Sequence, residues 1–258
     1  MYWDQLTSPA LGRVDRSTPV LLPLGATEQH GPHLPLATDR LLGELLCARA
    51  EAVDPRAVVV LPAIAVGCSA HHLAFAGTLS LGHSTFARQV GEVVESVLIA
   101  GFQTVVLFNA HGGNQGIGTV IVEHLGARHP ELTVVFTSWW QLAAAELLQI
   151  STSGPGGVGH ACELETSMML ALAPELVDTR AIPPRSGALP YAWNQSDMLR
   201  GGRARLYLSQ DQVSDNGVYG DPASATTEKG QAAVAAITDQ LKALLDSLRD
   251  GHDSVRRP

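Results

Sequence analysis

A short apolar run near the N-terminus is followed by a group of acidic and histidine residues. Glu28 and His30 are two positions apart, and Asp39 follows them. In extended backbone, residues i and i+2 point to the same side, so Glu28 and His30 can converge on one point. Two carboxylates and an imidazole form a ligand set that divalent metals accept. Each residue alone fits an ordinary loop, turn or helix-capping role, but together they predict part of a metal site.

Further candidate ligands occur at two places later in the chain. His111 lies in the glycine-rich segment 109–114, and the segment 160–165 offers an acid beside His160. Because a carboxylate has two oxygens, Asp39 is the candidate bridge between two ions. Two such ions would polarise a carbonyl and activate a water as the nucleophile. His160 would then be free to shuttle a proton, because imidazole titrates near neutral pH.

The elements that must position these residues are those of an α/β fold. Short apolar runs predict buried strands over 20–22, 57–61, 103–108 and 132–137. Helical spacing of apolar residues predicts helices over 41–53, 84–100, 115–128, 168–172 and 233–245. Alternation of strands and helices along the chain indicates a mostly parallel sheet with helices on both faces, and with active-site loops at the carboxyl ends of the strands. Glu28, His30 and His111 all follow such ends, so we expect the fold to bring them together.

Three other residues are candidates for contact with a substrate. Ser69 and His72 lie in a loop after the second predicted strand, where each also fits an ordinary hydrogen-bonding role. Trp139 and Trp140 are predicted to end the fourth strand. Alternation along a strand would send one ring into the core and leave the other to line a pocket.

The length and composition favour one domain over residues 1–258. The segment 181–222 is rich in proline, glycine and asparagine and contains Tyr191 and Trp193. Loops of this length often act as lids or subunit contacts, so we predict a long surface excursion there. Residues 250–258 are expected to form a flexible tail.

The charge balance excludes some classes of partner. The chain has 17 basic and 25 acidic residues, a net charge of -8, and no basic cluster, which argues against nucleic acid as a partner. Three cysteines without CxxC spacing argue against a disulfide framework and fit a reducing compartment. Neither a signal-peptide pattern nor an apolar run of about 20 residues is present. We therefore predict a cytoplasmic protein with no membrane partner.

The turn after the third predicted strand allows a second interpretation. A strand, a glycine-rich turn and a helix N-terminus, as over 109–118, can bind phosphate. The spacing G-G-x-x-G-x-G matches neither common phosphate-binding pattern, and His111 at its mouth suits a metal better. A metal-free phosphate-binding protein is therefore the alternative from another functional class.

Five segments of the chain resemble motifs of the creatininase family. They are GATEQHGPHLPLATD at 25–39, HHLAFAGT at 71–78, NAHGGN at 109–114, HACELETS at 160–167 and GVYGDP at 217–222. The resemblance covers nearly the whole chain and implies a three-layer α/β/α sandwich. It also implies two divalent ions per subunit (Zn, Mn or Fe), assembly as a homo-oligomer, often a hexamer, and hydrolysis of amide-type C–N bonds.

The resemblance implies a role for each candidate residue. Glu28 and His111 resemble the ligands of one metal, and His30 resembles a ligand of the other. Asp39 resembles the bridging carboxylate. His160 resembles the catalytic histidine of the family.

The chain departs from the creatininase pattern at two positions. Creatininase proper takes its last ligand from a glutamate where this chain has Gly113. Glu163 is the expected substitute, and Glu165 is the second choice, as a ligand or as a catalytic residue that supports one. A tryptophan is replaced by Gly156, so the aromatic clamp for creatinine is incomplete, although Trp140 resembles its other tryptophan.

We therefore predict a dinuclear metal-dependent hydrolase acting on an amide-type C–N bond in a small molecule or a modified peptide. Hydrolysis of a lactone, or of another C–O or C–C bond, is the alternative at the same site. Members that lack the glutamate act on several kinds of substrate, and the sequence does not choose among them.

Overall fold

A computed structural model describes residues 1–194 and 197–251. Its main sheet is parallel and has the strand order β2-β1-β3-β4. The strands are β1 (Val20–Leu24), β2 (Val59–Val60), β3 (Thr104–Asn109) and β4 (Thr133–Ser138). The two central strands, β1 and β3, are buried along their whole length, as expected for apolar strands with helices on both faces.

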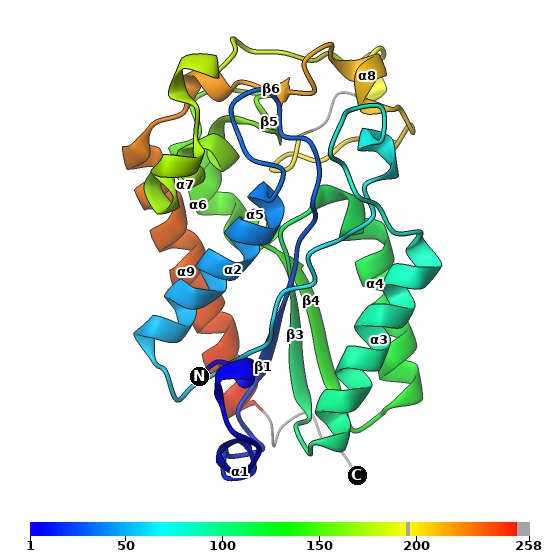
Figure 1. Ribbon diagram of the computed structural model, residues 1–258, viewed down its shortest axis with the longest axis vertical. Coiled ribbons are helices and arrows are strands. Elements are labelled where there is room, and N and C mark those ends of the chain that lie inside the picture. The colour runs from blue at the N-terminus through cyan, green and yellow to red at the C-terminus, as the bar shows by residue number, and fades with distance from the viewer. Residues whose placement is uncertain (195–196, 252–258) are drawn as a thin grey trace.

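Helices cover both faces of this sheet (Figure 1). One face carries α2 (Thr38–Val53), α7 (Glu163–Leu172) and α9 (Thr227–Asp250), and the other carries α3 (His83–Ile99) and α4 (Gln115–Arg128). Alternate residues of each strand pack against the helices on opposite faces of the sheet. Leu21 packs with the first group of helices, whereas Val20 and Leu22 pack with the second. The predicted α/β/α arrangement is confirmed.

The two adjacent tryptophans correct one detail of the prediction. They begin the short helix α5 (Trp139–Leu142) instead of ending β4, and α6 (Ala144–Ile150) follows. Both rings are buried and meet edge to face, with centroids 5.2 Å apart. In a helix the strand alternation no longer applies, so neither ring is forced to the outside.

A small antiparallel sheet lies beyond the carboxyl ends of the parallel strands (Figure 1). It pairs β5 (Val158–His160) with β6 (Tyr219–Gly220). The described part of the excursion 181–222 contains the short helix α8 (Gln210–Val213) and β6, and it covers the same end of the molecule.

The remaining elements are short. The helix α1 spans Ser8–Leu11, and 3-10 turns occur at Trp3–Gln5, Ala70–His72, Gly112–Asn114, Pro174–Leu176, Thr179–Ala181, Ala192–Asn194 and Pro222–Ser224. Of the predicted tail, Asp250 is the last residue of α9 and residues 252–258 lie outside the described residues. Among the described helices, none combines the length and apolar character needed to cross a membrane.

Candidate metal centre

Two neighbouring strands direct the candidate ligands to one edge of the sheet. Leu24, the last residue of β1, is paired with Asn109, the last residue of β3. Glu28 and His30 therefore follow one strand while His111 follows its neighbour, so all three residues lie at the same edge of the sheet. Asp39, in the first turn of α2, completes the group.

Asp39 lies between two imidazoles. Its Oδ1 is 3.1 Å from Nε2 of His30, and its Oδ2 is 2.9 Å from Nδ1 of His111. The same nitrogen of His111 is 3.4 Å from Oε1 of Glu28. All four side chains are buried, with exposed fractions of 2% or less. Asp39 thus contacts a candidate ligand with each oxygen, and its bridging of two ions stays a prediction.

The carboxylates of this cluster have imidazoles as their polar neighbours. Within the described residues, both oxygens of Glu28 and Oδ2 of Asp39 are buried without a hydrogen bond of standard geometry, and imidazole nitrogens lie 2.9 to 3.5 Å from Asp39 Oδ2 and Glu28 Oε1. Leaving a buried carboxylate uncompensated costs several kcal/mol, so buried charges are normally paired or bound to a metal. Oxygen and imidazole ligands suit zinc, manganese and iron. The residues present therefore fit divalent cations.

The cluster shifts the pKa of its own members. Burial disfavours the charged form of Glu28, but the facing imidazole of His111 outweighs it and lowers the pKa of this carboxyl. Burial also opposes a charge on His30, yet Asp39 beside it raises the pKa of His30 to about 9. Protons and metal ions compete for the same nitrogens, so metal binding at this cluster would release protons.

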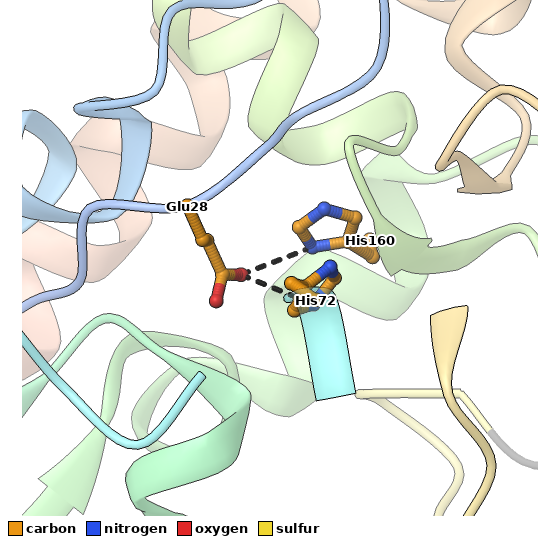
Figure 2. A group of neighbouring side chains, drawn as sticks. All are labelled: Glu28, His72 and His160. Carbon is orange, nitrogen blue, oxygen red and sulfur yellow. Dashed lines mark ion pairs between the residues drawn. The ribbon is translucent and has the colours of Figure 1, made fainter. Parts of the chain in front are cut away.

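Two more imidazoles face the carboxylate of Glu28 (Figure 2). Nε2 of His72 is 3.3 Å from Oε1 of Glu28, and Nδ1 of His160 is 3.5 Å from the same atom. Their rings lie 4.2 Å apart between centroids. The sequence indicated His72 only as a pocket residue, and its contact with Glu28 was missed because loop 70–72 has no periodicity that fixes a direction.

Gln29 fixes the position of the proton on His72. Its Oε1 accepts a hydrogen bond from the backbone N–H of Gly31 at 3.0 Å, which leaves the amide nitrogen as the donor. That nitrogen donates to Nδ1 of His72 at 2.7 Å and to the backbone oxygen of Gly217 at 2.9 Å. His72 therefore carries its proton on Nε2, which faces the carboxylate of Glu28.

His160 has the opposite arrangement. Its Nε2 donates to the backbone oxygen of Gln29 at 2.7 Å, so Nδ1 faces Glu28 with a lone pair. Burial, followed by the nearby imidazoles of His72 and His30, lowers the pKa of His160 well below its ordinary value. A neutral imidazole whose lone pair points into the cluster can accept a proton there.

The two acids of α7, Glu163 and Glu165, point in different directions. Residues two positions apart on an α-helix point about 200° apart, so only one of them can face the cluster. Glu165 does so, and its carboxylate lies in one candidate metal-binding group with His30 and His160. Its Oε2 also accepts the backbone N–H of Cys162 at 3.2 Å, and burial raises the pKa of Glu165 to about 7.

Glu163 points elsewhere, and its predicted ligand role is therefore corrected. Its Oε1 forms an ion pair with Lys229 at 2.5 Å, and its Oε2 accepts hydrogen bonds from Ser151 at 2.6 Å and Ser153 at 2.5 Å. Both oxygens are already satisfied. Glu163 joins the loop before β5 to the start of α9 and holds this part of the fold together.

The structure also explains why the last ligand cannot come from position 113. A Cβ added to Gly113 would lie 2.1 Å from the backbone oxygen of Cys68 and 2.4 Å from Nε2 of His111. A glutamate there would require the loop and the ring to move. We therefore place Glu165 with the candidate ligands.

Ser69 lies behind a candidate ligand. Its Oγ is 3.3 Å from Nε2 of His111, and the backbone oxygen of Cys68 is 3.2 Å from the same atom. These contacts orient the ring so that Nδ1 faces the carboxylates. Ser69 is fully buried, so its predicted contact with a substrate finds no support in its position.

A cavity of about 520 Å³ adjoins the cluster. Gly112 and Gly159, which are the chain neighbours of His111 and His160, form part of its wall together with Trp140. Described residues of the excursion, within 189–194 and 197–213, supply much of the rest. Trp140 is thus placed where the sequence predicts a pocket residue.

The missing aromatic clamp has a structural counterpart. Gly156 has a φ of +72°, a conformation that favours glycine, and a Cβ there would lie 3.2 Å from Nη2 of Arg185. The guanidinium of Arg185 is fixed by the backbone oxygens of Ser153 and Pro155. A tryptophan at this position would therefore have to adopt a positive φ, which is unfavourable for it, and its side chain would meet the guanidinium of Arg185.

The phosphate-binding alternative finds little support in this geometry. His111 at the mouth of the turn 109–118 faces the carboxylates of Glu28 and Asp39. Two buried acids would repel a phosphate at this place.

Comparison with known proteins agrees with the fold. The chain is 35% identical over 245 residues to the mycofactocin precursor peptide peptidase of Mycobacterium tuberculosis, covering 91% of this chain and 88% of that one. It is 32% identical over 174 residues to the creatinine amidohydrolase of Pseudomonas putida, covering 62% and 66%. A solved structure of the manganese form of creatininase superposes with a TM-score of 0.78 at 25% identity, covering 96% and 97%.

The family model named Creatininase, described as creatinine amidohydrolase, matches residues 4–245. The chain therefore belongs to the creatininase family, and the curated relatives that it resembles are hydrolases.

Proposed function

We propose that the protein is a hydrolase that uses two divalent cations to cleave an amide-type C–N bond in a small molecule or a modified peptide. The observation that carries this proposal is the buried carboxylate of Glu28, whose Oε1 lies 3.3 to 3.5 Å from imidazole nitrogens of His72, His111 and His160. The relatives support the reaction class, since one is named for a peptide and another for creatinine.

The ligands divide into two sets that share one residue. Glu28, Asp39 and His111 would hold one ion, while His30, Asp39 and Glu165 would hold the other. Zinc, manganese or iron suits these donors. When bound, such ions polarise a carbonyl and lower the pKa of a water molecule.

The protein's own residues would supply the proton transfers. Hydrolysis of an amide requires a proton to leave the attacking water and a proton to reach the departing nitrogen. His160 is suited to both steps, because its Nδ1 carries a lone pair toward Glu28 while Nε2 is held by Gln29. Trp140 would bound the substrate on one side of the cavity. A cytoplasmic location and assembly as a homo-oligomer, with a hexamer as the expected size, remain predictions.

Metal content and turnover test the proposal together. Elemental analysis of protein purified without chelators should give about two equivalents per chain, and a screen of cyclic amides, formamides and peptides should find a substrate that a chelator protects from hydrolysis. Glu28→Gln should lower metal content and abolish turnover. Glu44→Gln, on the partly exposed face of α2, is the matched control and should change neither. Full activity in metal-free protein would overturn the proposal.

A further inference from the structure

We propose that the cavity beside the metal centre binds a carboxylate of the substrate through Arg205 and Asn194, so that the substrate is an amide bearing a separate negative charge. This inference rests on the proposed function for the identity of the bond that is cleaved. The binding of the carboxylate itself rests only on the cavity.

The charges around the cavity are unequal. Arg205 and Asp197 are the charged side chains in its wall. Asp197 is already compensated, since its Oδ2 pairs with Nη1 of Arg200 at 2.8 Å and accepts the backbone N–H of Gly156 at 2.9 Å. Its Oδ1 accepts two more backbone N–H groups. Arg205 forms no ion pair with any residue in the described part of the chain. The cavity therefore presents a net positive group in a protein whose net charge is -8.

A buried amide in the same wall also lacks an acceptor. Asn194 is 4% exposed, and its Nδ2 has no hydrogen-bond partner among the residues described. Leaving a buried donor unpaired is costly, so such a group usually awaits a ligand or a water. A carboxylate accepts hydrogen bonds at both oxygens and would satisfy a guanidinium and an amide at once.

The wall of the cavity combines two parts of the molecule. It contains Gly112 and Gly159, the chain neighbours of His111 and His160 of the metal centre, together with residues of the excursion that carries Arg205. Trp140, Leu206 and Leu208 provide apolar surface in the same wall. An N-acyl amino acid, or a peptide with a free carboxyl group, has these three parts: an amide, an apolar body and a carboxylate.

Matched probes separate the carboxylate from the rest of the ligand. We would titrate the metal-loaded protein, by calorimetry, with N-benzoylglycine, N-benzoyl-β-alanine and N-benzoyl-4-aminobutyrate, and with the carboxamide of each. The series varies the spacing between the amide and the carboxylate. At least one acid should bind about tenfold or more tightly than its carboxamide, as expected for hydrogen bonds to a charged group.

Variants assign this preference to the cavity. In Arg205→Gln, the affinities for an acid and its carboxamide should differ by no more than about threefold. Arg205→Lys should retain part of the preference for the acid. Asn194→Asp should reverse the preference, because its carboxylate repels that of the ligand. Arg203→Gln is the matched control, because Arg203 is also exposed but does not line the cavity, and it should keep the full preference. Equal binding of acids and carboxamides by the wild-type protein, or an unchanged preference in Arg205→Gln, would overturn the inference.

The metal is the rival binding site for a carboxylate, and chelation distinguishes the two. A preference that disappears after chelation and persists in Arg205→Gln belongs to the metal and overturns the inference. If the protein binds metal and hydrolyses amides but binds each acid and its carboxamide with equal affinity, the proposed carboxylate site is wrong and the proposed hydrolase stands. If it binds no metal but keeps a preference that depends on Arg205, the hydrolase is wrong and the carboxylate site stands.

Discussion

The backbone oxygen of Gln29 accepts a hydrogen bond of 2.7 Å from Nε2 of His160. Because the acceptor belongs to the main chain, no side-chain substitution at position 29 removes it. The side-chain amide nitrogen of Gln29 donates to Nδ1 of His72 and also lies 3.0 Å from Nε2 of His160. One residue thus fixes two histidines through separate groups, and each histidine turns its other nitrogen toward Glu28.

The side chain of Gln29 can be replaced while the backbone acceptor of His160 stays in place. Gln29→Met keeps the length of the side chain and removes the donor to Nδ1 of His72. We expect kcat for any amide that the protein hydrolyses to fall roughly tenfold to a hundredfold, the usual effect of losing a partner that orients a site residue. Metal content should stay the same. Gln231→Met, at an exposed position of α9, is the control, and an unchanged kcat in Gln29→Met would contradict the assigned role.

Gly217 offers an independent route to the same contact. It has a φ of +78°, and a Cβ there would lie 2.0 Å from Oε1 of Gln29. Gly217→Ala should therefore displace the amide and lower kcat as Gln29→Met does. Gly154 has a φ of +69° with open space around it, so Gly154→Ala isolates the backbone cost of about 1 kcal/mol. Equal behaviour of the two variants in melting temperature and kcat would show that the clash with Gln29 is unimportant.

The two glutamates of α7 should respond in opposite ways to substitution. Glu165→Gln should lower metal content measured by elemental analysis, because Glu165 lies with His30 and His160. Glu163→Gln should keep its metal and lose stability, because the largely buried Lys229 loses its partner. The expected loss is about 2–3 kcal/mol, less than for a fully buried pair because Lys229 is 18% exposed. Loss of metal in Glu163→Gln alone would restore its predicted ligand role.

The ion pair of Glu163 also predicts a dependence of stability on pH. Burial opposes its ionisation, but hydrogen bonds from Lys229, Ser151 and Ser153 outweigh it and lower the pKa of Glu163 from 4.5 to about 2. A lowered carboxyl pKa stabilises the fold above the unfolded value, here by about 3 kcal/mol, and this stabilisation is lost as pH falls from 4.5 toward 2. The difference in free energy of unfolding between wild type and Glu163→Gln should shrink over that range. A constant difference from pH 7 to pH 3 in denaturant titrations would contradict this account.

Removing metal should destabilise the protein. The carboxylates of Glu28 and Asp39 are buried at the cluster, and bound cations would compensate their charge. Saturating metal is expected to raise the melting temperature by about 5–10 °C relative to chelated protein. Glu28→Gln should show a smaller difference. An identical melting temperature with and without metal, in protein shown to bind it, would mean that the cluster is compensated in another way.

The sequence determined much of the fold because buried strands and helices have different apolar spacing. Val20–Leu24 is apolar throughout, and Thr104–Asn109 is apolar between its first and last residues, which is typical of central strands of a parallel sheet. Strand β2 is shorter than expected, since only Val59–Val60 pairs with β1. The sequence does not show how many residues of an apolar run find a hydrogen-bonding partner in the sheet.

For the site, the sequence by itself determined which residues could take part, because Glu28, His30, Asp39 and His111 follow strand ends or begin a helix at one edge of the sheet. It did not determine the direction of side chains within α7, in the loop at His72 or around Gln29. The choice of Glu165 over Glu163 follows from the rotation of a helix that is packed against the sheet and from the position of Lys229 on a distant helix. The proton positions on His72 and His160 follow from hydrogen bonds to Gln29, which approaches each of them from another part of the chain. These choices depend on contacts between segments far apart in the sequence, so only the tertiary structure decided them.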